Sequence, residues 1–191
     1  MIGKLLKAKN WQIFILIFGL PFLIQMILVL FSTKSNFPEV WIKFAPWLII
    51  LYMTGFLTWL WSAAIGLQSK IPSGIKMRVK KFKILFFIPI IYIPVVLVFM
   101  QSLPRGTTRI GNELSGIIAG GFFSVIFILH ILSIFGILYS IYFAAKTFKT
   151  AELQREVKYS ELTLELFLFW FFPLGIWIIQ PKINKIMKLE R

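Results

Sequence analysis

The segment Gln68-Ser-Lys-Ile-Pro-Ser-Gly-Ile-Lys-Met-Arg-Val-Lys-Lys-Phe-Lys83 separates two long apolar halves of this 191-residue chain. It contains no acidic residue and six basic ones, which are Lys70, Lys76, Arg78, Lys80, Lys81 and Lys83. A short basic loop between membrane spans is the best sequence marker of the cytoplasmic side. We therefore expect this loop to face the cytoplasm and to contact anionic lipid headgroups, which attract lysine and arginine.

The composition excludes an ordinary soluble domain. Hydrophobic residues make up 59% of the chain and charged residues 15%, whereas a soluble domain carries about 25% charged residues. Apolar runs of 18 or more residues recur, and each is long enough to cross a bilayer. The net charge of +14 would suggest nucleic-acid binding in a soluble protein. Here the charges lie in loops between apolar runs, so we expect no nucleic-acid partner.

The order of the apolar runs predicts an all-α membrane protein with a single integral membrane domain over residues 1–191. We expect four transmembrane helices in two hairpins, at about 11–31, 44–67, 84–103 and 116–145, with the basic loop between the second and the third. The charged stretch 146–161 suits either a short amphipathic helix or a solvated extension of the fourth span.

A fifth apolar segment, residues 162–180, is harder to assign. Its uncharged core spans 166–179, which is short for a full crossing, and Pro173 and Gly175 interrupt it. Four crossings place 17 of the 21 Lys and Arg residues on the cytoplasmic side, whereas five crossings place 13 there. The positive-inside rule therefore favours both termini in the cytoplasm and a re-entrant, interfacial or marginal fifth segment.

Part of this segment, Phe172-Pro-Leu-Gly-Ile-Trp-Ile-Ile-Gln-Pro-Lys-Ile-Asn184, resembles the ending of some small bacterial inner-membrane proteins of unassigned function. The resemblance implies a protein of the bacterial cytoplasmic membrane. It implies no activity and no site residue.

Two rows of small residues predict close helix packing. In the second span the row consists of Gly55, Thr58, Ser62 and Gly66, and in the fourth of Gly136, Ser140 and Ala144. Small side chains spaced three or four residues apart let the backbones of two membrane helices approach closely. We interpret both rows as packing seams.

Three polar residues within the apolar segments are candidates for function. His130 lies near the centre of the fourth span, and we expect it to face the bundle interior, either in a polar pathway or in a hydrogen bond to another helix. Gln25 is a possible hydrogen-bond partner for it across the bundle. Glu165 begins the last segment and is expected to pair with a lysine or to be hydrated. If the segment dips inward, Glu165 becomes the sole buried acid and a stronger candidate.

The remaining chemistry of the sequence is sparse. The chain has no Cys and no Asp, one His, and no nucleophile, metal or phosphate-loop motif. We therefore expect no catalytic site, cofactor or metal, and a structural or accessory subunit that packs against another membrane protein or itself. The alternative is a small oligomeric transporter or channel with a polar route near His130, Gln25 and Glu165. A lipid enzyme would require Glu165, Lys158 and Ser160 to converge.

Overall fold

The structure, a computed structural model, describes residues 2–32, 37–102 and 113–188, and within these ranges the chain is helical and contains no strand. Long apolar runs become helices because a helix satisfies its own backbone hydrogen bonds. The elements are α1 (Ile2–Lys7), α2 (Asn10–Phe14), the π-helical turn η1 (Ile15–Gly19), α3 (Leu20–Ser32), α4 (Phe37–Gly66), the 3₁₀ turn η2 (Gln68–Lys70), α5 (Val79–Ser102), α6 (Glu113–Leu153), the 3₁₀ turn η3 (Tyr159–Leu162), α7 (Thr163–Trp170) and α8 (Phe172–Lys188).

Four stretches of the described chain are long and apolar enough to cross a membrane. They are Asn10–Phe31, Lys43–Lys70, Val79–Val98 and Phe123–Leu153. The prediction of an all-α chain with four such helices is confirmed, and it supports a multi-pass membrane protein. The predicted end of the third span, residue 103, lies outside the described residues.

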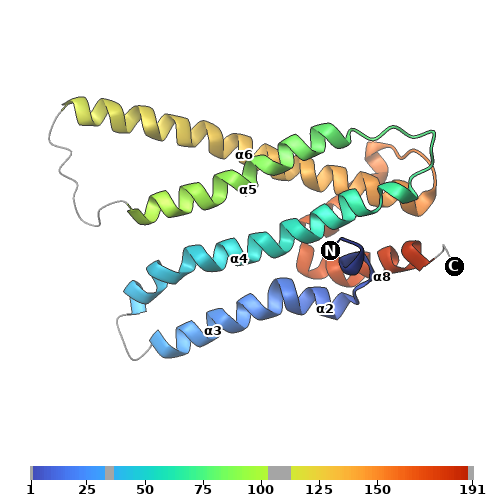
Figure 1. The fold of residues 1–191 in the computed structure, drawn as a ribbon, viewed down its shortest axis with the longest axis horizontal. Coiled ribbons are helices and arrows are strands. Elements are labelled where there is room, and N and C mark those ends of the chain that lie inside the picture. Colours follow the sequence, from blue (N-terminus) through green and yellow to red (C-terminus); the bar gives the residue numbers. More distant parts are fainter. Residues whose placement is uncertain (1, 33–36, 103–112, 189–191) are drawn as a thin grey trace.

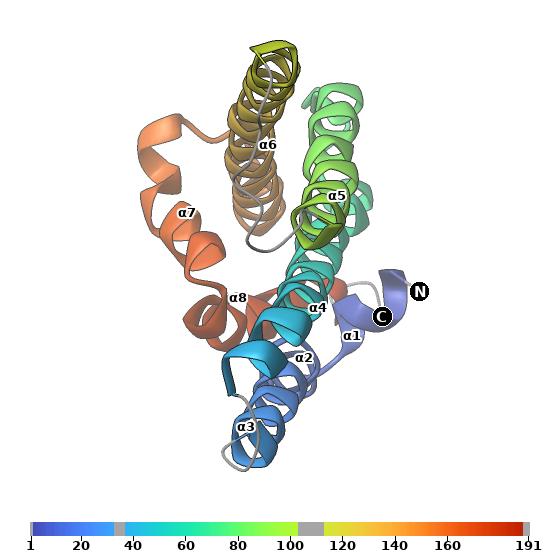
Figure 2. The same ribbon diagram turned by 90° about the vertical axis from the view of Figure 1, so that its left-hand side faces the viewer.

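Helix α4 is the centre of the molecule. Of its membrane-length window 44% is buried, compared with 17–22% in the other three. Helix α3 lies along one side of α4, and α5 and α6 lie together on the other (Figure 1). Viewed from the end, α7 lies beside α6 and leads into α8 (Figure 2). The rings of Phe169 and Phe172 from these two helices pack against Trp59 and Phe56 of α4. This arrangement buries α4 and leaves apolar side chains of α3, α5 and α6 exposed.

The first span is helical from α2 to α3 but widens into the π-helical turn η1 just before Pro21. Proline has no N–H and its ring crowds the preceding turn, and an inserted residue in a helix is one way to relieve this conflict. The same turn places Ile17 against α4, where its side chain is buried.

Helix α6 continues as far as Leu153, so half of the predicted amphipathic connector belongs to it. Thr147 and Phe148 in this extension are buried against neighbouring helices, so the extension is packed and not solvated as the second interpretation proposed. Gln154 ends the helix with a φ of 54°, the left-handed conformation common at helix C-termini. The sequence suggested the helical pattern but not the packing partners that bury it.

Helices α7 and α8 meet at Phe171 with a bend of 118°. Pro173 lies in the first turn of α8, where its missing N–H breaks no helical hydrogen bond. Gly175 is required here, because a Cβ atom at this position would overlap the carbonyl oxygen of Leu168. The Pro-Leu-Gly sequence therefore shapes a sharp reversal between two closely packed helices.

The charged segments gather at one end of the molecule. Helix α1, the basic loop before α5, the turn after α6 and the end of α8 all lie at the right of Figure 1. The far ends of α3, α4, α5 and α6 lie at the left, where the described side chains are mainly apolar. The fold thus has one polar end and one long apolar body.

Candidate functional site

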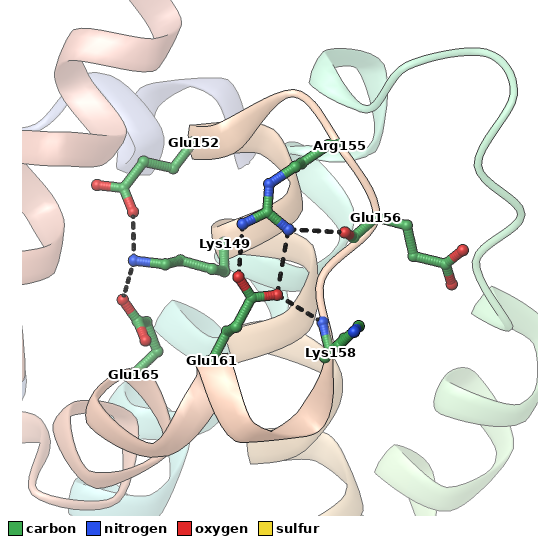
Figure 3. A network of polar contacts seen from close by, with 7 residues as sticks. All are labelled: Lys149, Glu152, Arg155, Glu156, Lys158, Glu161 and Glu165. Atoms are coloured by element: carbon green, nitrogen blue, oxygen red, sulfur yellow. Dashed lines mark hydrogen bonds and ion pairs between the residues drawn. The ribbon is translucent and has the colours of Figure 1, made fainter.

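A chain of ion pairs joins α6, α7 and α8 at the polar end. The Nζ atom of Lys149 lies 2.7 Å from Oε1 of Glu165 and 3.0 Å from Oε2 of Glu152 (Figure 3). The other carboxylate oxygen of Glu152 lies 2.9 Å from Nζ of Lys182. Four alternating charges therefore connect three consecutive helices, α6, α7 and α8.

The pair between Lys149 and Glu165 is the most buried of these ion pairs. Glu165 is 2% exposed and Lys149 is 19% exposed, and Glu165 is the only buried acidic residue in the described part of the chain. A charge removed from water loses several kcal/mol of solvation and must be compensated by a close partner. Lys149 provides that compensation, so the expected pairing of Glu165 with a lysine is present in the structure. It holds α7 against α6.

A second, exposed group fixes the turn between α6 and α7. The Arg155 guanidinium donates to both carboxylate oxygens of Glu161, at 2.5 and 3.1 Å, and the Lys158 backbone N–H donates to the same carboxylate at 2.8 Å (Figure 3). The bonds from Arg155 and from this backbone N–H lower the pKa of Glu161 to about 2. Glu161 therefore remains charged, and the turn remains bridged, in mildly acidic solution.

The side chain of Gln180 is a hub between α8, α4 and the N-terminal segment. Its Nε2 donates to the carbonyl oxygens of Leu5 and Ala8, both at 3.1 Å, and its Oε1 accepts from Nε1 of Trp59 at 3.1 Å. Asn184, one turn later, donates to the carbonyl of Ala8 at 3.0 Å. The last carbonyls of a helix lack partners within that helix. Gln180 bonds to one such carbonyl of α1, that of Leu5, and both Gln180 and Asn184 bond to the carbonyl of Ala8, which follows the helix.

Two further amides attach the start of the basic loop to α6. Gln68 donates to Oγ1 of Thr147 at 3.2 Å, and Gln154 donates to the carbonyl oxygen of Lys70 at 2.9 Å. The hydroxyl of Thr150 is buried in the same region and has no hydrogen-bond partner among the described residues. The start of the loop is therefore held by α6, and its basic residues extend from a fixed base.

The three candidate polar residues do not meet. Nδ1 of His130 lies 3.1 Å from the hydroxyl of Tyr92 on α5, and the hydroxyl of Tyr52 on α4 donates to Oε1 of Gln25 at 3.5 Å. Glu165 lies at the polar end with Lys149. The proposed pairing of Gln25 with His130 is therefore wrong, because each has a tyrosine partner on its neighbouring helix.

The orientation expected for His130 is also wrong. Its side chain is exposed on α6, although Ser133, one turn away, is buried. Helix α6 contacts mainly α5 along this part of its length, so a residue beside that contact remains partly outside the bundle. The sequence places His130 at membrane depth but gives no indication of its outward direction.

The row of small residues on α4 has two uses. A Cβ atom on Gly55 would lie 3.2 Å from the backbone of Ile17, so this glycine allows the first span to pack closely. Thr58 and Ser62 instead line a cavity between α4 and α5. Gly66 is half-buried at the end of α4. Only part of the row therefore lies in a helix contact.

The row on α6 lies at the contact with α5 and the core behind it. A Cβ atom on Gly136 would lie 2.6 Å from the carbonyl oxygen of Leu85. That carbonyl is four residues before Pro89, whose missing N–H cannot bond to it. Ser140 and Ala144 are fully buried along the same helix. Gly136 thus allows α6 to approach α5 at the site of a proline.

The basic residues of the loop are mostly directed outward. Lys70 is half-buried, while the other five, Lys76, Arg78, Lys80, Lys81 and Lys83, are exposed. Lys81 also lies 5.0 Å from the ring centre of Tyr139, which attracts the cation through the ring face. Four of the five exposed residues precede or open α5, where positive charge is unfavourable for the helix dipole. No acidic residue in the first turn of α5 offsets that cost.

The cavity between α4 and α5 has a volume of about 410 Å³. It is lined mainly by apolar side chains of both helices and by Leu5 of α1. His130, Gln25 and Glu165 do not line it. The polar route that a transporter would need at these three residues is thus not formed by this cavity.

The described residues do not form a recognisable catalytic arrangement. Glu165 is buried, whereas Lys158 and Ser160 are exposed, and Figure 3 shows Lys158 directed away from Glu165. Within the described ranges no three His, Cys, Asp or Glu side chains gather as a metal site would require. The arrangement of charges at the polar end can fix helices together, which is a structural capability.

Sequence reasoning missed Lys149, Gln180 and Asn184. Gln180 and Asn184 are spaced four residues apart among isoleucines that are buried in α8, and this polar pair on an apolar face is the signal that identifies them. No sequence signal identified Lys149, because its partner, Glu165, lies beyond the turn that joins α6 to α7. No protein-family model, curated protein or solved structure matches the chain.

Proposed function

We propose that this chain is a small, non-enzymatic accessory subunit of the bacterial cytoplasmic membrane, and that it binds another membrane protein or a second copy through the outward face of α6. The observation that carries the proposal is His130. Its side chain is exposed within an apolar helix, and its only partner in the described chain is the Tyr92 hydroxyl at Nδ1. The second ring nitrogen, Nε2, therefore has no partner there.

An unpaired polar nitrogen that faces lipid is unfavourable, because hydrocarbon cannot replace the hydrogen bonds of water. Polar side chains in membrane helices accordingly face other helices, and each such hydrogen bond contributes about 1 kcal/mol to association. The neighbouring positions on α6 offer a broad apolar contact. Phe127 and Ile134, which flank His130 on the same face, are 65% and 41% exposed. A partner helix on this face would pair Nε2 and cover both side chains.

The contacts between helices at the polar end further support an accessory role. Its charged and amide side chains bond to one another and to backbone carbonyls, and they join α1, α6, α7 and α8. Such bonds stabilise a scaffold. The transporter alternative is not favoured, because His130, Gln25 and Glu165 have separate partners and share no cavity.

For topology, we place the polar end in the cytoplasm, with two helix hairpins crossing the membrane and α7–α8 re-entering from the same side. Helix α7 has eight residues and rises about 12 Å, which is less than half of the ~30 Å hydrocarbon core. The ion pair between Lys182 of α8 and Glu152 of α6 returns the chain to the polar end. Exposed Trp170 and Phe171 at the reversal suit insertion among lipids.

The absence of cysteine permits a direct test of the partner face. A single cysteine replaces Phe127 or Ile134, carries a benzophenone crosslinker, and is irradiated in native membranes. We expect one discrete protein adduct, at twice the mass of the chain if the partner is a second copy. Replacing His130 with Ala in the same chain should weaken that adduct. Leu23→Cys on the exposed face of α3 is the control. Equal adducts at Leu23 and Phe127, or lipid adducts alone, would contradict the proposal.

A further inference from the structure

The cavity between α4 and α5 has the shape of a site for a single lipid chain. Its α4 wall extends from Ile50 to Ser62, and its α5 wall from Phe86 to Pro94. Twelve helical steps rise about 18 Å, which is close to the ~15 Å thickness of one hydrocarbon leaflet. The volume of about 410 Å³ falls in the range of small-molecule sites, ~300–1,000 Å³, and is far smaller than a partner helix needs.

The walls of this cavity call for an apolar occupant. Apart from three hydroxyl side chains, the lining consists of aliphatic, aromatic and proline residues. Two of the hydroxyls are already bonded within α4: Thr58 donates to the Thr54 carbonyl at 2.6 Å, and Ser62 donates to the Thr58 carbonyl at 2.8 Å. Hydroxyls bonded to their own helix present little unsatisfied polarity to a ligand. The cavity therefore favours hydrocarbon over water.

The cytoplasmic end of the cavity is positively charged. Phe87 lines the cavity, and Lys83 and Lys80 lie one and two turns earlier on the same face of α5. Both lysines are exposed and form no ion pair within the described part of the chain. On the opposite side, Leu5 of α1 closes the same end and is preceded by the exposed Lys4. At the opposite end the one comparable charge in the described chain is Lys43, two turns before Ile50 on α4, against three lysines at the cytoplasmic end.

We infer that the α4–α5 cavity binds one anionic glycerophospholipid of the cytoplasmic leaflet, with an acyl chain between the two helices and its phosphate at Lys80 and Lys83. Three lysines lie at one end of the cavity and one at the other, and the apolar groove between them is as long as one leaflet. A phospholipid has the same division between a charged headgroup and an apolar chain. The inference uses the orientation of the polar end proposed above. It does not depend on the α6 partner, because no residue of α6 lines the cavity.

Native mass spectrometry of the purified full-length chain in mild detergent tests this site. The probes are phosphatidylglycerol and phosphatidylcholine with the same two acyl chains. We expect one tightly retained phosphatidylglycerol, and K80Q/K83Q should reduce the preference for it over phosphatidylcholine roughly tenfold. K185Q/K188Q removes the same charge from exposed positions on α8 and should leave the preference unchanged. Equal losses in the two double variants would overturn the inference, since the lysines would then act only as diffuse charge.

Filling the cavity separates chain binding from headgroup binding. Thr54→Phe and Ile90→Phe each add bulk to one wall, and both should lower retention of both lipids. Circular dichroism and thermal unfolding would identify the variant that keeps the fold, and one folded variant is sufficient. Unchanged lipid retention in a folded, filled variant would overturn the inference. Because the chain is tested alone, its outcome is independent of any crosslinked partner at α6.

Discussion

Oε1 of Glu165 lies 2.7 Å from Nζ of Lys149, and this contact connects the reversed C-terminal helices to the longest helix of the molecule. Sixteen residues separate the two in sequence, and the turn stabilised by Arg155 and Glu161 brings them together. The carboxylate is almost fully buried, and the ammonium group of the lysine compensates for its lost hydration. The position of α7–α8 therefore depends on this pair.

Glu165→Gln should destabilise the protein. The substitution leaves Lys149 in a mostly buried site without its nearer carboxylate, and loss of one partner of a buried pair costs about 3–5 kcal/mol. Glu152 still contacts Lys149, so we expect the lower end of that range, measured by thermal unfolding in detergent. Glu156→Gln is the matched control, because Glu156 is 70% exposed and its pair with Lys146 should contribute less than about 1 kcal/mol. Equal effects of the two variants would show that burial is unimportant here.

Gln180→Ala should release the N-terminal segment. It leaves the buried Nε1 of Trp59 without its acceptor, and an unsatisfied buried group costs about 1–3 kcal/mol. The carbonyls of Leu5 and Ala8 also lose their bond to α8 from Gln180, although each keeps one other donor. Limited trypsin digestion measures the release as faster cleavage after Lys7 and Lys9. Lys185→Ala changes an exposed residue on the same helix and should leave this cleavage rate unaltered. An unchanged rate in Gln180→Ala would refute the role of the hub.

Two identical substitutions on α6 should have opposite effects. Gly136→Ala places a methyl group against the Leu85 carbonyl and should cost about 1–3 kcal/mol. Gly121→Ala meets no atom of the described residues within 4 Å and should be neutral or stabilising by up to about 1 kcal/mol through helix propensity. Thermal unfolding of both variants measures the difference. If both were neutral, the close approach of α5 and α6 would be incorrect.

The lowered pKa of Glu161 predicts that the folded protein becomes less stable as the pH falls. Its pKa is lowered from 4.5 to about 2 by Arg155 and the Lys158 backbone N–H, so its contribution to folding is complete above about pH 4.5 and is lost as the pH falls toward 2. Carbon-13 NMR of the labelled carboxyl group would follow the titration. In Arg155→Gln the midpoint should move up toward 4.5. A midpoint that does not move would exclude the guanidinium as the main cause.

The sequence was sufficient to predict the helical class and the four apolar spans. Bilayer thickness sets span length, and apolar runs of that length are visible directly, as in residues 11–31. It also indicated Pro173 and Gly175 as a break, and the structure shows why: Gly175 packs on the Leu168 carbonyl. These features are local, so a single sequence can reveal them.

The tertiary partners could not be predicted in the same way. The pairing of Lys149 with Glu165 depends on the path of the intervening turn, and the outward orientation of His130 depends on where α5 contacts α6. The small residues Thr58 and Ser62 match a packing seam equally well whether a helix or a cavity faces them. Helical periodicity defines a face but does not identify what covers it.

The central claim is that the chain crosses the membrane four times, with α7–α8 re-entering and the polar end in the cytoplasm. The single-cysteine variants Ser73→Cys, in the basic loop, and Lys185→Cys, in α8, test it with a membrane-impermeant maleimide on intact bacterial cells. Thr107→Cys, in an outer loop predicted from sequence and outside the described residues, provides the positive control. We predict that the Thr107→Cys variant is labelled on intact cells, and that the other two variants are labelled only after permeabilisation. Labelling of Lys185→Cys from outside, with Ser73→Cys protected, would establish a fifth crossing and contradict the account.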